Sequence, residues 1–179
     1  MAKSTVILGV TGSIAAYRAC DIINALIKES VNVEALLTKE AKEFITPLTL
    51  QTLSGNKVIM DMFELPDEWN PAHTSLADSS DLILIAPATA AIIGKLAGGI
   101  CDDMMSCAVF AAKAPVLIAP AMNNNMYRHK IVQENIAKLK SIGYKFVGPI
   151  KGRLACGREG IGHIAGTGDI VDEVKRLLK

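Results

Sequence analysis

The chain has 179 residues, half of them apolar, and its 19 basic and 18 acidic side chains leave a net charge of +1. This length and composition predict one globular domain with a sizeable core over residues 1–179 and exclude a disordered chain. The balanced charge leaves no electrostatic footprint for nucleic acid or an anionic membrane, so neither is expected as a partner. Without a signal-peptide pattern or a membrane-spanning apolar stretch, and with no C-x-x-C pair among four cysteines, a cytoplasmic protein is expected.

Short apolar runs and helical patterns alternate along the chain. The runs of strand length are 5–10, 31–38, 82–87, 115–120 and 145–149, with a weaker one at 58–63. Helical spacing follows over 131–142, and an amphipathic pattern closes the chain over 166–179. Continuous apolar strands that alternate with helices predict a doubly wound parallel α/β sheet, Rossmann-like or flavodoxin-like, in a single domain.

Three further segments interrupt this alternation. Pro47 is expected to end one helix or to begin a short second one. The polar stretch 65–81 is predicted to be a long loop, and loops of that length are often functional. The stretch 152–166 has too many glycines for a helix and too little apolar alternation for a strand, so we expect a flexible segment around Cys156.

Ligands of such sheets bind at the carboxyl ends of the strands, where the strand order reverses. If strand 82–87 lies beside strand 5–10, the segments 11–17 and 87–95 face each other across a crevice. Gly12 and Ser13 stand where the first strand turns into a helix, which suits a phosphate, although a plain tight turn explains them equally well. The second strand ends in Thr38 instead of an acidic residue, which favours a mononucleotide such as FMN over NAD.

Polar residues at the later strand ends have both structural and functional interpretations. Thr89 can cap the following helix, and the asparagines after residue 122 can be caps or can bind a carboxylate. Ser106 can add a hydroxyl to the site. His73, in the long loop, is the histidine best suited to act as a general base, although a loop histidine is more often structural. No histidine has the spacing of a metal ligand.

Five motifs occur together in one order: "GSIAAY" at 12–17, "PAHTSLA" at 71–77, "PATA" at 87–90, "PAMNNNM" at 120–126 and "ACGREGIG" at 155–162. Together they resemble the flavin-dependent cysteine decarboxylases over essentially the whole chain. The resemblance assigns FMN binding to Gly12, Ser13, Ile14, Thr38, Thr89, Ala90, Ser106 and Ala121. It assigns catalysis to His73, Asn123 and Cys156, and substrate binding to Asn123, Met126, Ala155 and Gly157. The chain departs from the family pattern at Tyr127, where Trp is usual, and at Ala91 and Ile92, where some relatives carry polar side chains.

The resemblance implies decarboxylation of 4′-phosphopantothenoylcysteine to 4′-phosphopantetheine in coenzyme A biosynthesis. In the family mechanism FMN oxidises the cysteinyl side chain, carbon dioxide leaves the resulting thioaldehyde, and the enethiolate is then reduced. Cys156 would supply a proton from a mobile clamp whose glycines give it hinge freedom. A trimer or a multiple of trimers is implied, and the ligase that many bacterial members carry as a second domain is expected on a separate chain.

Alternatives to this function come from different classes. A peptidyl-cysteine decarboxylase of the lantibiotic type would share the flavin site but would release the enethiol without reduction. A non-catalytic regulatory subunit of the same fold would need none of His73, Asn123 and Cys156. A flavin prenyltransferase shares the fold but lacks the "PAMN" and "ACG" motifs.

Overall fold

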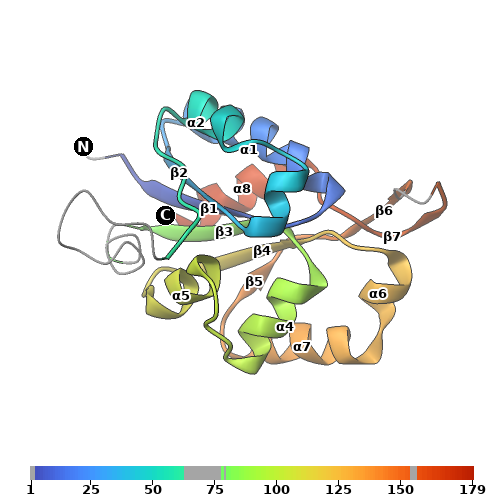
Figure 1. Ribbon diagram of the computed structural model, residues 1–179. Coiled ribbons are helices and arrows are strands. Elements are labelled where there is room, and N and C mark those ends of the chain that lie inside the picture. The colour runs from blue at the N-terminus through green and yellow to red at the C-terminus, as the bar shows by residue number, and fades with distance from the viewer. Residues whose placement is uncertain (1–2, 63–77, 79, 154–156) are drawn as a thin grey trace.

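The computed structural model describes residues 3–62, 78, 80–153 and 157–179 and contains a five-stranded parallel sheet with the strand order β2-β1-β3-β4-β5 (Figure 1). Its strands are β1 (Thr5–Val10), β2 (Asn32–Leu37), β3 (Leu82–Ala88), β4 (Val116–Pro120) and β5 (Lys145–Phe146). The three central strands are almost entirely buried, which explains their continuous apolar sequences. The predicted fold class is therefore confirmed.

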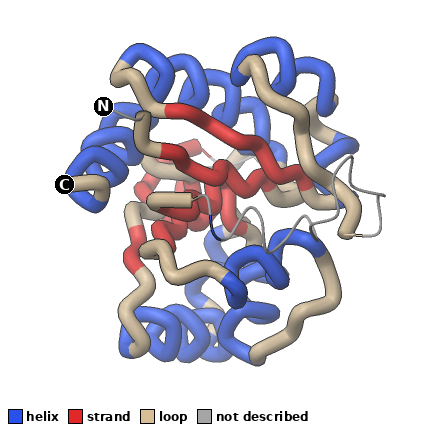
Figure 2. The backbone as a smooth tube through the Cα atoms, turned by 90° about the vertical axis from the view of Figure 1, so that its left-hand side faces the viewer, coloured by secondary structure: helices blue, strands red, loops and turns tan. Residues whose placement is uncertain are grey.

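Helices cover both faces of the sheet, as Figures 1 and 2 show. One face carries α1 (Arg18–Lys28), α2 (Pro47–Ser54) and α8 (Thr167–Leu177); the other carries α4 (Ala90–Gly98), α5 (Met104–Ala111) and α7 (Lys130–Ser141). The short elements η1 (Ile14–Tyr17), η2 (Lys39–Glu43) and α6 (Asn124–Arg128) follow the ends of β1, β2 and β4. None of the described helices is long and apolar enough to cross a membrane.

Side chains that point alternately to the two faces of the sheet form a hydrophobic core on each face. In β1, Val6 and Leu8 pack with Ile22 of α1 on one face, while Ile7 packs on the other face with Ile93 of α4. Side chains of neighbouring strand residues point to opposite faces, so a fully buried strand must be apolar at every position.

The strand order reverses between β1 and β3. From β1 the chain crosses to β2 on one side and then returns to β3 on the other side, so that Val6 pairs with Leu82 and Gly9 with Ile85. The carboxyl ends of β1 and β3 consequently lie side by side. The expected juxtaposition of the segments 11–17 and 87–95 is confirmed.

Some predicted boundaries differ from the structure. The weak run 58–63 contributes only an isolated parallel bridge between Leu36 and Ile59, and β5 is confined to two residues. Pro47 begins α2, with Thr46 as the cap whose hydroxyl accepts a hydrogen bond from Thr49 N. Most of the predicted loop 65–81, including His73, lies outside the described residues.

In the glycine-rich segment the expectation that no strand forms was wrong, whereas Cys156, around which flexibility was expected, lies outside the described residues. The segment contains an antiparallel hairpin of β6 (Ile150–Arg153) and β7 (Glu159–His163). Its glycines serve close packing: a Cβ on Gly160 would lie 2.9 Å from Asn124 Cβ, and one on Gly162 would lie 2.1 Å from the Met122 carbonyl oxygen. Glycine here permits strand pairing against another segment, which the absence of apolar alternation concealed.

Candidate functional site

Two pockets open at the carboxyl edge of the sheet. The smaller has a volume of about 240 Å³ and lies between the ends of β1, β2 and β3. Its lining combines small and polar residues: Thr11, Gly12, Thr38, Glu40, Thr89, Ala90, Ala91, Ile92, Lys95, Asp103 and Met126. Four of the predicted flavin-binding residues, Gly12, Thr38, Thr89 and Ala90, therefore meet in one place.

Thr11, which the sequence analysis missed, holds this edge together. Its side chain is only 2% exposed; Oγ1 donates a hydrogen bond to the Pro87 carbonyl over 2.7 Å and accepts one from Thr89 N over 3.1 Å. The hydroxyl thus joins the turn after β1 to the turn after β3. A threonine after a strand is too common to reveal such a role, which depends on the pairing of β1 with β3.

Gly12 and Thr38 each contribute one feature to the smaller pocket. Gly12 allows a close approach of the backbone, and Thr38 supplies a hydroxyl without a described hydrogen-bond partner. A Cβ on Gly12 would lie 2.5 Å from Glu40 Cβ, so only glycine allows the turn to approach η2 this closely. Thr38 Oγ1 is buried and has no hydrogen-bond partner among the described residues. Because a buried hydroxyl without a partner is costly, its position fits a ligand oxygen that completes the hydrogen bond.

The other two polar residues predicted for this site also have structural tasks. Thr89 caps α4 by accepting a hydrogen bond from Ile92 N over 3.5 Å, as the simpler interpretation anticipated, and it lines the pocket as well. Ser106 lines neither pocket. It is buried in the capping box of α5, where its backbone N–H donates to Asp103 Oδ1 and its hydroxyl accepts from Asp103 N.

Lys95 and Asp103, two charged residues that line the smaller pocket, are paired with each other. Lys95 Nζ lies 2.7 Å from Asp102 Oδ1 and 2.6 Å from Asp103 Oδ2. Burial raises the pKa of Asp103, but the hydrogen bonds from Lys95 and Ser106 outweigh it, so that the pKa lies below its ordinary value. The hydrogen bonds that Lys95 makes to Asp102 and to Asp103 raise the pKa of Lys95. Lys95 and Asp103 therefore remain charged at neutral pH and fix the start of α5 beside the pocket.

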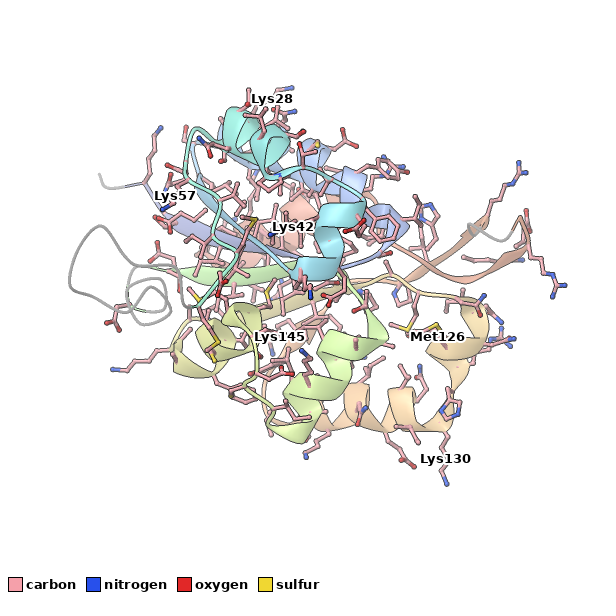
Figure 3. All side chains as sticks on the ribbon, in the orientation of Figure 1. Lys28, Lys42, Lys57, Met126, Lys130 and Lys145 are labelled. Atoms are coloured by element: carbon pink, nitrogen blue, oxygen red, sulfur yellow. The ribbon has the colours of Figure 1, made fainter. Side chains whose placement is uncertain are left out.

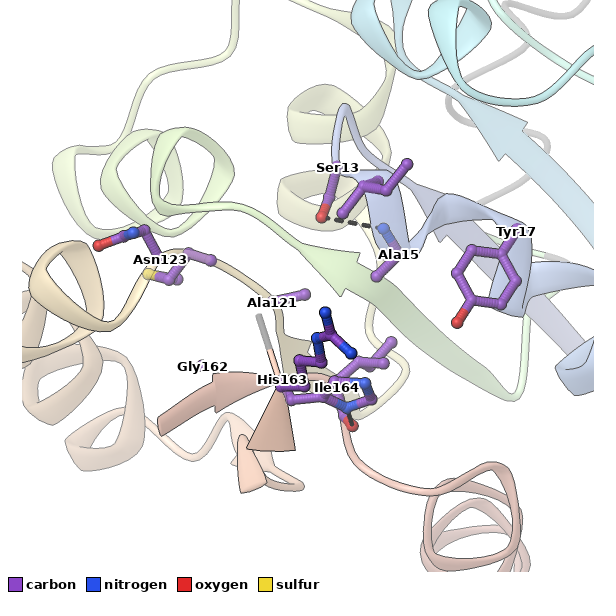
Figure 4. A pocket seen from close by; sticks show the side chains of 11 residues that line it. Ser13, Ala15, Tyr17, Ala121, Asn123, Gly162, His163 and Ile164 are labelled. Atoms are coloured by element: carbon purple, nitrogen blue, oxygen red, sulfur yellow. Dashed lines mark hydrogen bonds between the residues drawn. The ribbon is translucent and has the colours of Figure 1, made fainter. Parts of the chain in front are cut away.

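The larger pocket has a volume of about 520 Å³, within the roughly 300–1,000 Å³ usual for small-molecule sites. It is lined by Ser13, Ile14, Ala15, Tyr17, Ala121, Met122, Asn123, Arg153, Gly162, His163 and Ile164 (Figure 4). One wall comes from the turn and η1 after β1, the floor from the end of β4, and the opposite wall from the hairpin. Ser13, Ile14, Ala121 and Asn123 were predicted site residues, whereas Arg153 and His163 were not.

Asn123 is held by its own backbone neighbours. Its Oδ1 accepts a hydrogen bond from Asn125 N over 2.8 Å and so caps α6. Because the oxygen is used in this way, the Nδ2 amide group is the part of the side chain that can donate to a ligand. This arrangement suits the predicted role of Asn123 toward a carboxylate.

The hairpin is fastened to both neighbours of Asn123. Met122 N donates to the Gly162 carbonyl over 3.0 Å, and Ile161 N donates to Asn124 Oδ1 over 3.2 Å. Strand β7 thereby becomes a wall of the larger pocket. A sequence signal did exist, since glycines at 160 and 162 alternate in the way that a strand closely packed on one face requires.

The remaining predicted residues are distributed differently. His73, Ala155 and Cys156 lie outside the described residues. Met126, predicted to contact the substrate, is carried by α6 (Figure 3) and lines the smaller pocket, away from the lining that includes Asn123. Gly157 is exposed and lines neither pocket. Within the described part of the chain, no cluster of His, Cys, Asp and Glu could hold a metal ion.

A parallel sheet with two pockets at the carboxyl edge, where the strand order reverses, defines an α/β ligand-binding domain, and a family model specifies which kind. The Flavoprotein family model matches residues 1–179, so the chain belongs to this family.

Two curated relatives are similar to the chain over nearly its whole length. The chain is 47% identical over 169 residues to the coenzyme A biosynthesis bifunctional protein CoaBC of Bacillus subtilis, an alignment that covers 93% of this chain but 41% of that protein. It thus spans about two fifths of the length of such bifunctional relatives. A probable phosphopantothenoylcysteine decarboxylase of Streptococcus mutans is 41% identical over 175 residues, 97% of this chain and 98% of that one.

Solved structures agree with these relatives. A mutant PPC decarboxylase complexed with pantothenoylaminoethenethiol superposes with a TM-score of 0.87 at 30% identity and covers 98% of both chains. The FMN-dependent cysteine decarboxylase SpaF gives a TM-score of 0.85 at 27% identity, over 99% of this chain and 96% of that one.

Proposed function

We propose that the chain catalyses the FMN-dependent decarboxylation of 4′-phosphopantothenoylcysteine to 4′-phosphopantetheine, a step of coenzyme A biosynthesis. The observation that carries this proposal is the end-to-end match with the probable phosphopantothenoylcysteine decarboxylase of Streptococcus mutans. The two pockets at the carboxyl edge of the sheet support it, because seven of the eight residues assigned to FMN line one or the other of them.

The smaller pocket fits FMN by its own chemistry. The unpaired hydroxyl of Thr38 and the close approach that Gly12 allows suit a phosphate oxygen at the end of β1 and β2. The residues we assign to FMN are Gly12, Ser13, Ile14, Thr38, Thr89, Ala90, Ser106 and Ala121. Bound FMN supplies a hydride acceptor and, later in the cycle, a hydride donor.

Residues of the larger pocket would orient the substrate. Asn123 Nδ2 would donate to the substrate carboxylate, with the amide held in place by the bond from Asn125 N. Nearby apolar side chains such as Ile14 would exclude water from the carbon that loses its carboxylate. Ala155, Gly157 and Met126 are the further substrate contacts that we assign.

Two residues outside the described part of the chain complete the proposed mechanism. His73 would take a proton from the substrate as it is oxidised, because an imidazole exchanges protons near neutral pH. Cys156 would donate a proton to the enethiolate in the final reduction, a task for which a protonated thiol is suited.

The proposed setting is a cytoplasmic homo-oligomer, a trimer or a multiple of trimers. Ile14 and Tyr17 support self-association, since they are large apolar side chains that are 59% and 51% exposed at the rim of the larger pocket. A phosphopantothenate–cysteine ligase would supply the substrate, in agreement with the bifunctional character of the CoaBC relatives.

The first experiment is the mass of the product formed from 4′-phosphopantothenoylcysteine by the purified flavoprotein. Loss of carbon dioxide alone is expected. A product that lacks two further hydrogens would indicate chemistry of the peptidyl-cysteine decarboxylase type, without the final reduction. An unchanged substrate in the presence of bound FMN would contradict the proposed function and favour a regulatory role.

Two variants test the assigned roles. Cys156→Ser should release carbon dioxide yet accumulate the enethiol, whereas His73→Asn should bind FMN but fail to oxidise the substrate. Complete conversion by the first variant, or normal turnover by the second, would remove the residue from the mechanism.

A further inference from the structure

Arg153 and His163 have no place in the function proposed so far, although both line the larger pocket. They stand on the two antiparallel strands of the hairpin, where Arg153 pairs with Glu159 at one end and His163 pairs with Ile150 at the other, so only their side chains bring them to the same pocket. Each side chain can carry a positive charge. The question is which chemical group they would bind.

The hairpin fixes the orientation of the His163 ring. Nδ1 lies 2.8 Å from the carbonyl oxygen of Ile164, and because a carbonyl only accepts, Nδ1 must carry the hydrogen. Gly152 makes room for the ring: a Cβ at that position would lie 3.3 Å from His163 Cβ and Cγ. Nε2 is left for a ligand, and in the imidazolium form both ring nitrogens are donors, so that Nε2 can then donate to an anionic group.

Arg153 is not neutralised by the described part of the chain. Glu159 is its partner in the strand register, yet no described carboxylate forms an ion pair with the guanidinium. Among the described residues that line the larger pocket, none is an Asp or a Glu. In the smaller pocket, by contrast, Lys95 is paired with Asp103. The larger pocket is therefore the one with uncompensated basic character.

Taken with the proposed function, on which this inference rests, the geometry points to a phosphomonoester subsite formed by Arg153 and His163. A guanidinium and an imidazolium together match a phosphate dianion, since Arg presents paired N–H donors and His adds one more. The pair would hold the 4′-phosphate of the substrate on the hairpin wall, while Asn123 holds the carboxylate. It would make the enzyme selective for a phosphorylated small molecule over a cysteinyl peptide without a phosphate.

The test compares two substrates that differ only in the phosphate, 4′-phosphopantothenoylcysteine and pantothenoylcysteine. For the wild type, kcat/KM should be higher for the phosphorylated substrate. Arg153→Gln should lower kcat/KM for that substrate by roughly 10–100-fold, and His163→Gln by roughly 3–10-fold, because each removes a charge-assisted hydrogen bond. Neither variant should change kcat/KM for pantothenoylcysteine more than about twofold, which also shows that the variants are folded.

A matched control comes from the same strand. Lys151 is an exposed basic residue of β6 that lines neither pocket, so Lys151→Gln should leave the selectivity unchanged. If Lys151→Gln lowered kcat/KM for the phosphorylated substrate as much as Arg153→Gln does, only the overall charge of the hairpin would matter, and the subsite would be refuted. If Arg153→Gln lowered kcat/KM equally for the phosphorylated and the unphosphorylated substrate, the subsite would also be refuted.

Two further outcomes separate the possible sources of phosphate and the two proposals. If Arg153 bound the phosphate of FMN, Arg153→Gln would be purified without flavin, and the substrate subsite would be refuted. A wild type that converts neither substrate refutes the proposed function. A wild type that converts both substrates equally well leaves that function intact and refutes only the subsite.

Discussion

The two pockets at the carboxyl edge of the sheet are built in different ways. The smaller one is formed by strand ends and the helices that follow them, and Thr11 bonds its turns to each other. One wall of the larger pocket is formed by the β6–β7 hairpin, which is far in sequence from the turn after β1 on the other side of the pocket. The comparison indicates that the doubly wound sheet by itself forms the smaller pocket, whereas the larger pocket depends on the docking of the hairpin.

The largest expected effect lies in the hairpin contact. Gly162→Ala places a Cβ 2.1 Å from the Met122 carbonyl oxygen at a φ of +138°, so backbone strain and overlap add. We expect a loss of about 2–4 kcal/mol in unfolding free energy, together with loss of activity, measured by urea denaturation and turnover. Gly143→Ala is the control: φ is +103° there, but no atom lies within 4 Å of the added Cβ, so about 1–2 kcal/mol is expected. Equal losses of unfolding free energy in the two variants would show that the contact between Gly162 and Met122 does not contribute beyond the backbone strain.

A smaller effect is expected where the turns of the smaller pocket are joined. Thr11→Val removes a buried hydroxyl, which leaves Thr89 N unpaired and the Pro87 carbonyl with only the bond from Thr11 N, so a cost of about 1–3 kcal/mol of unfolding free energy is expected. Thr52→Val is the matched control, because the Thr52 hydroxyl also donates to a carbonyl, that of Leu48, but on the surface; a change within about 0.5 kcal/mol is expected. Similar values for the two variants would mean that Thr11 does not hold the edge together.

Thr38→Val sharpens the comparison because its effects on the apoprotein and on flavin binding should differ in sign. Removing a buried hydroxyl without a described partner should leave the apoprotein as stable as before or slightly more stable. The affinity for FMN should fall roughly tenfold if the hydroxyl donates to the ligand. Thermal unfolding of the apoprotein and titration of flavin fluorescence measure the two effects. Unchanged FMN affinity would remove Thr38 from the cofactor site.

The smallest effect concerns acid stability of the smaller pocket. The pKa of Asp103 is lowered in the folded state, because the hydrogen bonds from Lys95 and Ser106 outweigh the opposing effect of burial. A lowered folded pKa means that this stabilisation is present above the unfolded value of about 3.9 and is lost as the pH falls through the folded pKa. The deficit of Asp103→Asn relative to wild type, measured as the urea midpoint, should therefore shrink below about pH 4. Asp102→Asn, which keeps the helix cap, is the control; a deficit of Asp103→Asn that stays constant with pH would contradict the assignment.

The sequence could predict the smaller pocket because its residues follow strands whose apolar runs are unmistakable. Gly12, Thr38 and Thr89 each stand directly after such a run, and a parallel sheet brings the carboxyl ends of neighbouring strands to one edge. Thr11 could not be found in this way, since its importance depends on which strand lies beside β1.

The hairpin could not be predicted from apolar periodicity because little of it is buried by side chains. Glycines at 152, 160 and 162 let its backbone approach Asn124, Met122 and the His163 ring, so contact is made by backbone surface instead of an apolar face. Arg153 and His163 were missed with it, since neither becomes a pocket residue until the strands pair.

The attachment of Met122 and Asn124 to β7 has a consequence for how the sequence can vary. Asn123 lies between two residues that are bonded to the hairpin, while Gly160 and Gly162 leave no space for a side chain at the contact. A replacement on either side is therefore tolerated only with a compensating replacement on the other. We expect residues 122–124 and 160–162 to vary together among relatives, although almost forty residues separate them in the chain.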